Sequence, residues 1–176
     1  MRLLPPLLGA PIRFEWAPAL RTVGGSLRSG GPHGKEVHAA SFLRERRIVL
    51  DESLREDPAE LSRILVHELF HFAWVRLSND TRESWRQLLA HEFDRGARGE
   101  LGWSAECRKL ALRSSSTVTS GRAWSEYSCE SFCDTGAWIH LGGREHAECT
   151  LAPRFREIRR GWLQSMESHR GGRIRI

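Results

Sequence analysis

The chain has 176 residues, 40% of them hydrophobic, which suits one domain with its own core and leaves little room for two. Its charged fraction of 28% argues against wholesale disorder, and since no run approaches about 18 apolar residues we predict no membrane span. The net charge is +5, but the basic residues are spread out without a block of about five, so nucleic-acid binding is not indicated.

Residues 1–36 are rich in glycine and proline, including GGSLRSGGPHG at 24–34, and we predict a flexible N-terminal arm there. The apolar opening MRLLPPLL is broken by two prolines, and no small-residue cleavage site follows, so it does not match a secretory signal. With only four cysteines, this favours a cytoplasmic protein with reduced thiols. Residues 37–176 are expected to form a single domain.

The first regular elements are expected after this arm. Val37–Leu43 and Ile48–Leu50 are short stretches suited to strands, and the polar run Arg44–Arg47 separates them. This arrangement predicts a β-hairpin.

A helix is predicted from Asp57 onwards. Asp57 can accept hydrogen bonds from the first free amides, Pro58 suits the first helical position, and Glu60 completes a capping box. Apolar residues then recur at helical spacing, and more lie on the other faces, so we expect this helix to be buried nearly all round and to end near residues 78–80.

Four more helices are expected, at about 81–94, 104–113, 122–139 and 154–167. With the hairpin, they predict an α+β fold in which a small antiparallel sheet packs on a helical body.

His67, Glu68 and His71 form an H-E-x-x-H pattern in the middle of the first predicted helix. Residues four apart lie on one face of a helix, so both imidazoles can bind the same zinc ion. Glu68 can reach a water on the open side of the metal and accept its proton. Burying these polar groups without such a role would be costly, so we predict a Zn²⁺ site here.

Two histidines leave zinc short of a protein ligand, and several candidates lie downstream. They are His91, Glu92, His140, His146, Glu126, Glu130 and Asp134. The last three recur every four residues on one predicted helix, among mostly apolar or small residues. Acids in such surroundings need a cation or hydrogen-bond donors.

H-E-L-F-H followed by a helix with E-x-x-x-[E/D] resembles the gluzincin branch of the zincin metallopeptidases, over roughly residues 37–139. The resemblance implies a minimal zincin-like fold with His67 and His71 as zinc ligands and Glu68 as general base. It further implies that the first acid of the second helix binds zinc and that the acid four residues later orients a zinc-binding histidine.

These two roles can be assigned to the acids of the second helix in two ways, which we call frames. In the first, Glu126 is the ligand and Glu130 lies behind it; in the second, Glu130 is the ligand and Asp134 lies behind it. We prefer the first frame because Glu126-Tyr-Ser-Cys-Glu130-Ser-Phe132 resembles E-[FY]-x-[small]-E-x-F of gluzincin-like families at every position. Glu130 stays open as the alternative third ligand.

Other parts of a peptidase site are less well indicated. Zincins present an edge strand to the substrate, and either Ile48–Leu50 or Val37–Phe42 could be that edge. Tyr127, His140 and His146 are candidates to stabilise an oxyanion. Cys129 and Cys133 favour core packing over metal binding, because paired thiolate ligands usually come from C-x-x-C turns.

The sequence therefore predicts a zinc-dependent metallopeptidase, a hydrolase that cleaves a peptide or protein substrate with metal-activated water and Glu68 as general base. Two alternatives remain: a DNA-associated protease, and a regulatory module on a zincin scaffold with little general proteolysis. No membrane partner is expected, and the sequence does not indicate the cleavage preference or the oligomeric state.

Overall fold

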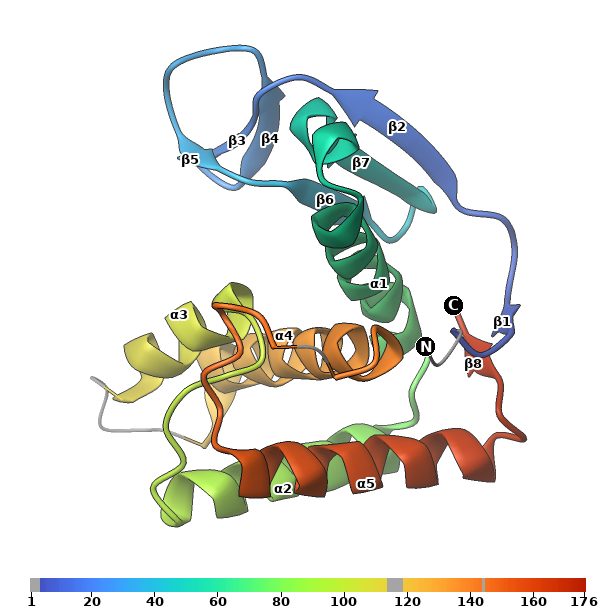
Figure 1. The fold of residues 1–176 in the computed structure, drawn as a ribbon, viewed down its shortest axis with the longest axis vertical. Coiled ribbons are helices and arrows are strands. Elements are labelled where there is room, and N and C mark those ends of the chain that lie inside the picture. The colour runs from blue at the N-terminus through green and yellow to red at the C-terminus, as the bar shows by residue number, and fades with distance from the viewer. Residues whose placement is uncertain (1–3, 114–118, 144) are drawn as a thin grey trace.

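The computed structural model describes residues 4–113, 119–143 and 145–176, and within them it has an α+β fold (Figure 1). The helices are α1 (Pro58–Trp74), α2 (Asn79–Asp94), α3 (Trp103–Arg113), α4 (Gly121–His140) and α5 (Pro153–His169). The strands are β1 (Leu7–Leu8), β2 (Arg13–Ala17), β3 (Leu20–Val23), β4 (Ser26–Ser29), β5 (Lys35–Glu36), β6 (Ala39–Phe42), β7 (Arg47–Asp51) and β8 (Ile174–Arg175). The short 3₁₀ helix η1 (Glu52–Glu56) joins β7 to α1. The predicted α+β class is thus confirmed.

The predicted hairpin is present as β6 and β7, which pair antiparallel with Phe42 opposite Arg47. The sheet is mixed rather than antiparallel, because β2 adds to the other side of β7 in parallel, in the order β2-β7-β6. The apolar residues Ile48–Leu50 therefore occupy the central strand and are buried, while β6 is left at the edge.

Residues 4–36 differ from the flexible arm that we predict from composition. They form β1–β5, and two of these strands pair with distant parts of the chain, β2 with β7 and β1 with β8. Leu20 is 2% exposed, and its N–H donates to Asp51 Oδ2 at 2.6 Å. The arm is therefore part of the fold wherever it is described; residues 1–3 lie outside the described residues.

Helix α1 begins as predicted. The Asp57 carboxylate accepts hydrogen bonds from the amides of Ala59 (3.1 Å) and Glu60 (3.0 Å). Glu60 pairs with Arg63 at 2.5 Å, in place of the expected return bond to the cap. The helix ends at Trp74, earlier than predicted, and Ser78, where we expect its end, instead caps α2 by accepting from the Thr81 amide.

Helix α4 packs closely on α1, and this packing sets which side chains of the two helices face each other. A side chain at Gly136 would start 2.2 Å from the Phe70 ring, so only glycine allows the helices to approach this closely. Phe132 fits beside Phe70 and Trp74, with ring centroids 5.4 and 5.3 Å apart. These contacts fix which face of α4 turns towards α1.

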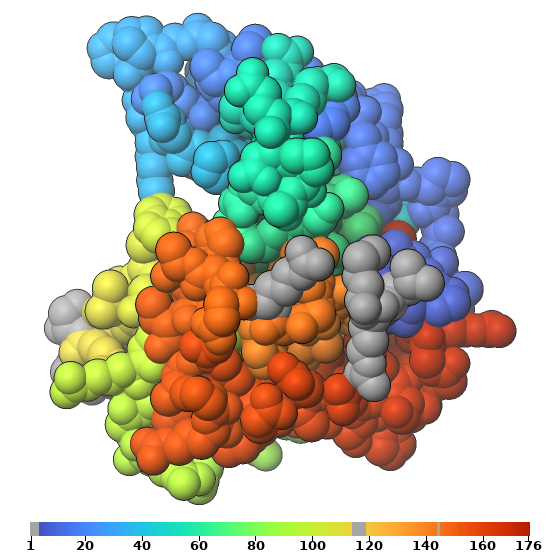
Figure 2. All heavy atoms as spheres, viewed as in Figure 1, coloured from blue at the N-terminus to red at the C-terminus, as the bar shows by residue number. Residues whose placement is uncertain are grey.

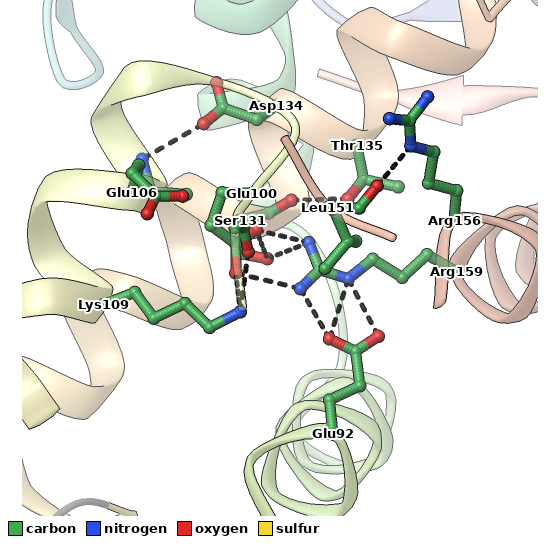
Figure 3. A network of polar contacts seen from close by, with 12 residues as sticks. Glu92, Glu100, Glu106, Lys109, Ser131, Asp134, Thr135, Leu151, Arg156 and Arg159 are labelled. Atoms are coloured by element: carbon green, nitrogen blue, oxygen red, sulfur yellow. Dashed lines mark hydrogen bonds and ion pairs between the residues drawn. The ribbon is translucent and has the colours of Figure 1, made fainter. Parts of the chain in front are cut away.

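A buried ionic network holds the helical body together (Figure 3). Arg159 of α5 contacts Glu92 of α2 and Glu100 of the α2–α3 connection, each at 2.6 Å. Lys109 of α3 contacts Glu100 at 2.8 Å, and all four side chains are at most 2% exposed. In the described part of the chain, no helix is both long and apolar enough to cross a bilayer.

Candidate metal centre

Helix α1 brings His67, Glu68 and His71 to the side of the molecule that faces α4 and β6. The Nε2 atoms of His67 and His71 lie 3.2 Å apart, as expected for side chains one helical turn apart on one face. His67 and Glu68 are buried, and His71 is half-buried. Both imidazoles therefore direct Nε2 towards one point.

Helix α4 brings Glu130 to the same point. Its Oε2 lies 3.2 Å from Nε2 of His67 and 3.9 Å from Nε2 of His71, and its Oε1 lies 3.1 Å from Nη2 of Arg108 on α3. Two imidazole nitrogens and one carboxylate oxygen thus converge from two helices.

Asp134, one turn further along α4, holds His67 from behind. Its Oδ1 lies 2.7 Å from Nδ1 of His67, and its Oδ2 accepts from the Ala105 amide at 3.1 Å. The carboxylate fills the space beside Gly102, where an added Cβ would lie 2.4 Å from its carbon. An ionised carboxylate can only accept, so His67 donates from Nδ1 and its Nε2 is free to bind a cation.

The electrostatics of the cluster call for a positive charge at the point of convergence. Burial opposes protonation of His67, but the charge of Asp134 and the hydrogen bonds to Asp134 and Glu130 together outweigh burial and raise the pKa well above its ordinary value. For His71, burial is likewise outweighed, chiefly by the hydrogen bond to Cys129, and the pKa rises to about 9. Burial would raise the pKa of Glu130, yet its contacts with the histidines hold it at about 2.

The cysteines of α4 complete the surroundings. One ligand atom each of His67, His71 and Cys133 lie within 4.8 Å of one another, so this group could also hold a metal ion. Burial raises the pKa of the Cys133 thiol well above its usual value, so a metal ion bound there would have to displace the thiol proton. Glu130 is anionic and lies beside the same two histidines, so it is a second candidate for a third ligand. Cys129 contacts Nδ1 of His71 at 3.5 Å, a neighbour that C-x-x-x-C spacing alone did not suggest.

Glu68 is held beside this cluster by the edge strand. Its Oε2 accepts from the Ser41 hydroxyl of β6 at 2.5 Å, and the same hydroxyl lies 3.2 Å from the Glu68 carbonyl oxygen. Of the two edge strands that the sequence allows, the structure thus places β6 against the histidine helix.

Two cavities meet at His67 and Glu68. One, of about 310 Å³, extends under residues 36–39 towards Arg63 and Trp103. The other, of about 230 Å³, extends along Ala39–Ser41 towards His71 and Glu130. Figure 2 shows an opening between the light-blue β5 region, green α1 and the yellow-green start of α3. Nζ of Lys35 on β5 lies 4.0 Å from the centre of the ring of Trp103, the first residue of α3.

Glu126, the third ligand in our preferred frame, is not part of this cluster. Its side chain is 48% exposed and pairs with Arg122 at 2.7 Å, whereas the two acids of the other frame, Glu130 and Asp134, both contact His67. The reason is that α4 turns the Glu130 face, and not the Glu126 side chain, towards α1.

The other candidates from the sequence lie outside this cluster. Glu92 contacts Arg159, His140 contacts Glu167 at 2.8 Å, His146 lies 3.7 Å from Glu60, and His91 is exposed. Tyr127 is fully buried and donates to Glu100, which makes it a core residue and not an oxyanion donor.

Comparison with known protein families, curated proteins and solved structures finds no significant match to this chain.

Proposed function

We propose that this chain is a zinc-dependent metallopeptidase with a zincin-like fold of the gluzincin type, and that His67, His71 and Glu130 hold Zn²⁺. The observation that supports this most directly is the convergence of Nε2 of both histidines and Oε2 of Glu130, with Glu68 beside them in a cleft. Two nitrogens and one oxygen, with a position left for water, make up the donor set of catalytic zinc sites.

Zinc would supply Lewis acidity, making a water molecule more acidic and a carbonyl group more electrophilic. The work of the chain itself is proton transfer. Because Ser41 holds Oε2 of Glu68, we assign Oε1 to accept a proton from the water that attacks the peptide carbonyl carbon. The same oxygen then gives this proton to the leaving amine nitrogen as the C–N bond breaks.

Other residues position the reacting groups. Asp134 fixes the ring of His67 so that Nε2 carries the lone pair. The edge strand β6 lies beside the cleft and offers backbone groups with which an extended peptide can pair. Arg108, at 38% side-chain exposure, brings a positive charge to the rim of the site.

The substitution Glu68→Gln tests this function. It keeps the size of the side chain but removes the base, so we expect the zinc content to stay at that of the parent while peptide cleavage falls by at least about 100-fold. Glu126→Gln, an exposed change of the same type, is the control and should retain both properties. Equal cleavage by the parent and Glu68→Gln would contradict the proposal. Zinc binding without cleavage by the parent would favour a regulatory module on the same scaffold.

A further inference from the structure

A third cavity lies apart from the metal centre, between the N-terminal half of α1 and the C-terminal end of α4. Its volume is about 420 Å³, larger than that of the cavity beside Glu68 and Trp103. Leu101, Ala137, Trp138, Leu141 and Cys149 supply apolar surface to it. A concave apolar site of this size is suited to hold an apolar group of a ligand.

The charged residues at the rim of this cavity already have partners within the fold, including Asp57, whose carboxylate accepts from the first amides of α1. Arg63 contacts Glu60 at 2.5 Å and Glu148 at 3.0 Å, and Glu145 contacts Arg156 at 3.0 Å. A charged ligand group would have to displace one of these partners, whereas an uncharged group would not. The charge pattern therefore selects a neutral, apolar occupant.

This cavity and the cleft that holds Glu68 share part of their walls. Arg63 lines both cavities, and the segment 101–104 runs from Leu101 in the apolar cavity to Trp103 and Ser104 beside the cleft. Glu60 and Arg63 precede His67 on α1 by about 6–10 Å of helical rise. An extended peptide covers about 3.3 Å per residue, so this distance corresponds to about two or three residues.

We propose that this cavity is the subsite for a large apolar side chain of the substrate, such as that of phenylalanine, about two or three residues from the cleaved bond. The inference rests on the peptidase function proposed above and adds a substrate class to it: peptides with an apolar anchor at a fixed distance from the cleavage point.

The cavity itself is tested by ligand binding, which does not depend on catalysis. Indole is the probe, and its binding to the zinc-loaded full chain is followed by ligand-observed NMR. Ala59 is exposed at the start of α1 and lines the cavity, so Ala59→Phe places a ring at its mouth without burying a new group elsewhere. Ala123 is exposed in the first turn of α4, and Ala123→Phe is the matched control. We expect indole to bind the parent and Ala123→Phe, and to bind Ala59→Phe at least about tenfold more weakly.

The subsite is tested with a set of peptides that differ only in the position of a single phenylalanine in a glycine- and serine-rich sequence. Mass spectrometry gives the cleaved bond. We expect kcat/KM to rise about tenfold or more when phenylalanine lies at one position, two or three residues from that bond. This preference should disappear in Ala59→Phe and persist in Ala123→Phe.

The outcomes separate the two proposals. If the parent cleaves peptides without a positional effect of phenylalanine, or if indole fails to bind or binds Ala59→Phe as well as the parent, the subsite is wrong and the peptidase function stands. If indole binds as expected but no peptide is cleaved by the zinc-loaded parent, the peptidase function fails and the subsite fails with it.

Discussion

Two acids one turn apart on α4 have opposite environments, and this difference is the reason that we propose Glu130 and not Glu126 as the third ligand. Glu126 is 48% exposed and pairs with Arg122, whereas Glu130 is 14% exposed and faces both histidines. A carboxylate that water and a local arginine already satisfy gains little from a metal ion. Glu130 has lost that hydration and is stabilised by positive charge at the point of convergence.

Zinc binding by Glu130→Ala and Glu126→Ala, measured side by side, tests this assignment. We expect Glu130→Ala to lose zinc by at least about 100-fold in affinity, because it removes a direct ligand, and Glu126→Ala to bind zinc like the parent. Competition with a fluorescent chelator gives both affinities. A larger loss of zinc affinity in Glu126→Ala than in Glu130→Ala would instead favour Glu126 as the third ligand.

In the proposed metal centre Asp134 contacts His67 and is not itself a ligand, so the effect of its substitution should be smaller. Asp134→Asn removes the charge that fixes the protonated Nδ1, and we expect zinc affinity to fall about 10–100-fold. Asp94→Asn, an exposed change of the same kind on α2, is the control and should have no effect. Zinc affinity like that of the parent in Asp134→Asn would show that the hydrogen bond to His67 does not support metal binding.

At the scale of the element, helix α1 carries three of the proposed site residues and depends on its cap. Asp57→Ala removes two hydrogen bonds to the first turn and should lower the free energy of unfolding by about 1 kcal/mol. Ser120 stands at the N-cap of α4 without a side-chain hydrogen bond to it, so Ser120→Ala is the control and should change stability by much less. Urea unfolding of both variants measures the difference; equal effects would mean that the Asp57 bonds add no stability.

The helices from α1 onwards could be predicted from the sequence because their signals are local. Asp57 and Pro58 mark the start of α1, and apolar residues at helical spacing mark the buried faces. The choice between Glu126 and Glu130 is not local, because it depends on which turn of α4 meets α1. One signal was available: Arg122 and Glu126 are four residues apart, the spacing of a solvent-exposed helical ion pair.

The N-terminal strands could not be predicted for the same reason. β2 becomes a strand by pairing in parallel with β7, with Arg13 opposite Arg47, and composition carries no sign of such a distant partner. The glycines that suggested flexibility instead supply turns: Gly24 and Gly25 both adopt positive φ in the tight connection between β3 and β4.

At the scale of the whole molecule, the ionic network around Arg159 supports the side of α4 that faces away from the histidines. Arg159 donates to the hydroxyl of Ser131 at 2.9 Å, and Ser131 directly follows Glu130 in the chain. Two cations, Arg159 and Lys109, meet two anions, Glu92 and Glu100, so the buried group has no net charge. Such a balanced group adds little as a whole, but removal of one member leaves an uncompensated charge.

Glu100 makes this network sensitive to acid. Burial would raise its pKa, but Arg159 and Lys109 outweigh burial and lower it to about 2, against an ordinary value of 4.5. The pKa is lower in the folded chain, so ionised Glu100 stabilises the fold fully above about pH 4.5, and this contribution is lost as the pH falls towards 2. The shift corresponds to about 3 kcal/mol, of which about 2 kcal/mol is lost by pH 3.

Urea unfolding at pH 7 and pH 3, with a chelator present to remove metal, measures this contribution. Glu100→Gln should be less stable than the parent at pH 7 by about 3 kcal/mol, because Arg159 and Lys109 lose a shared partner. Since glutamine does not titrate, the stability lost between pH 7 and pH 3 should be smaller in this variant than in the parent by about 2 kcal/mol. If both proteins lose the same stability over this range, Glu100 is not the group that couples the helical body to pH.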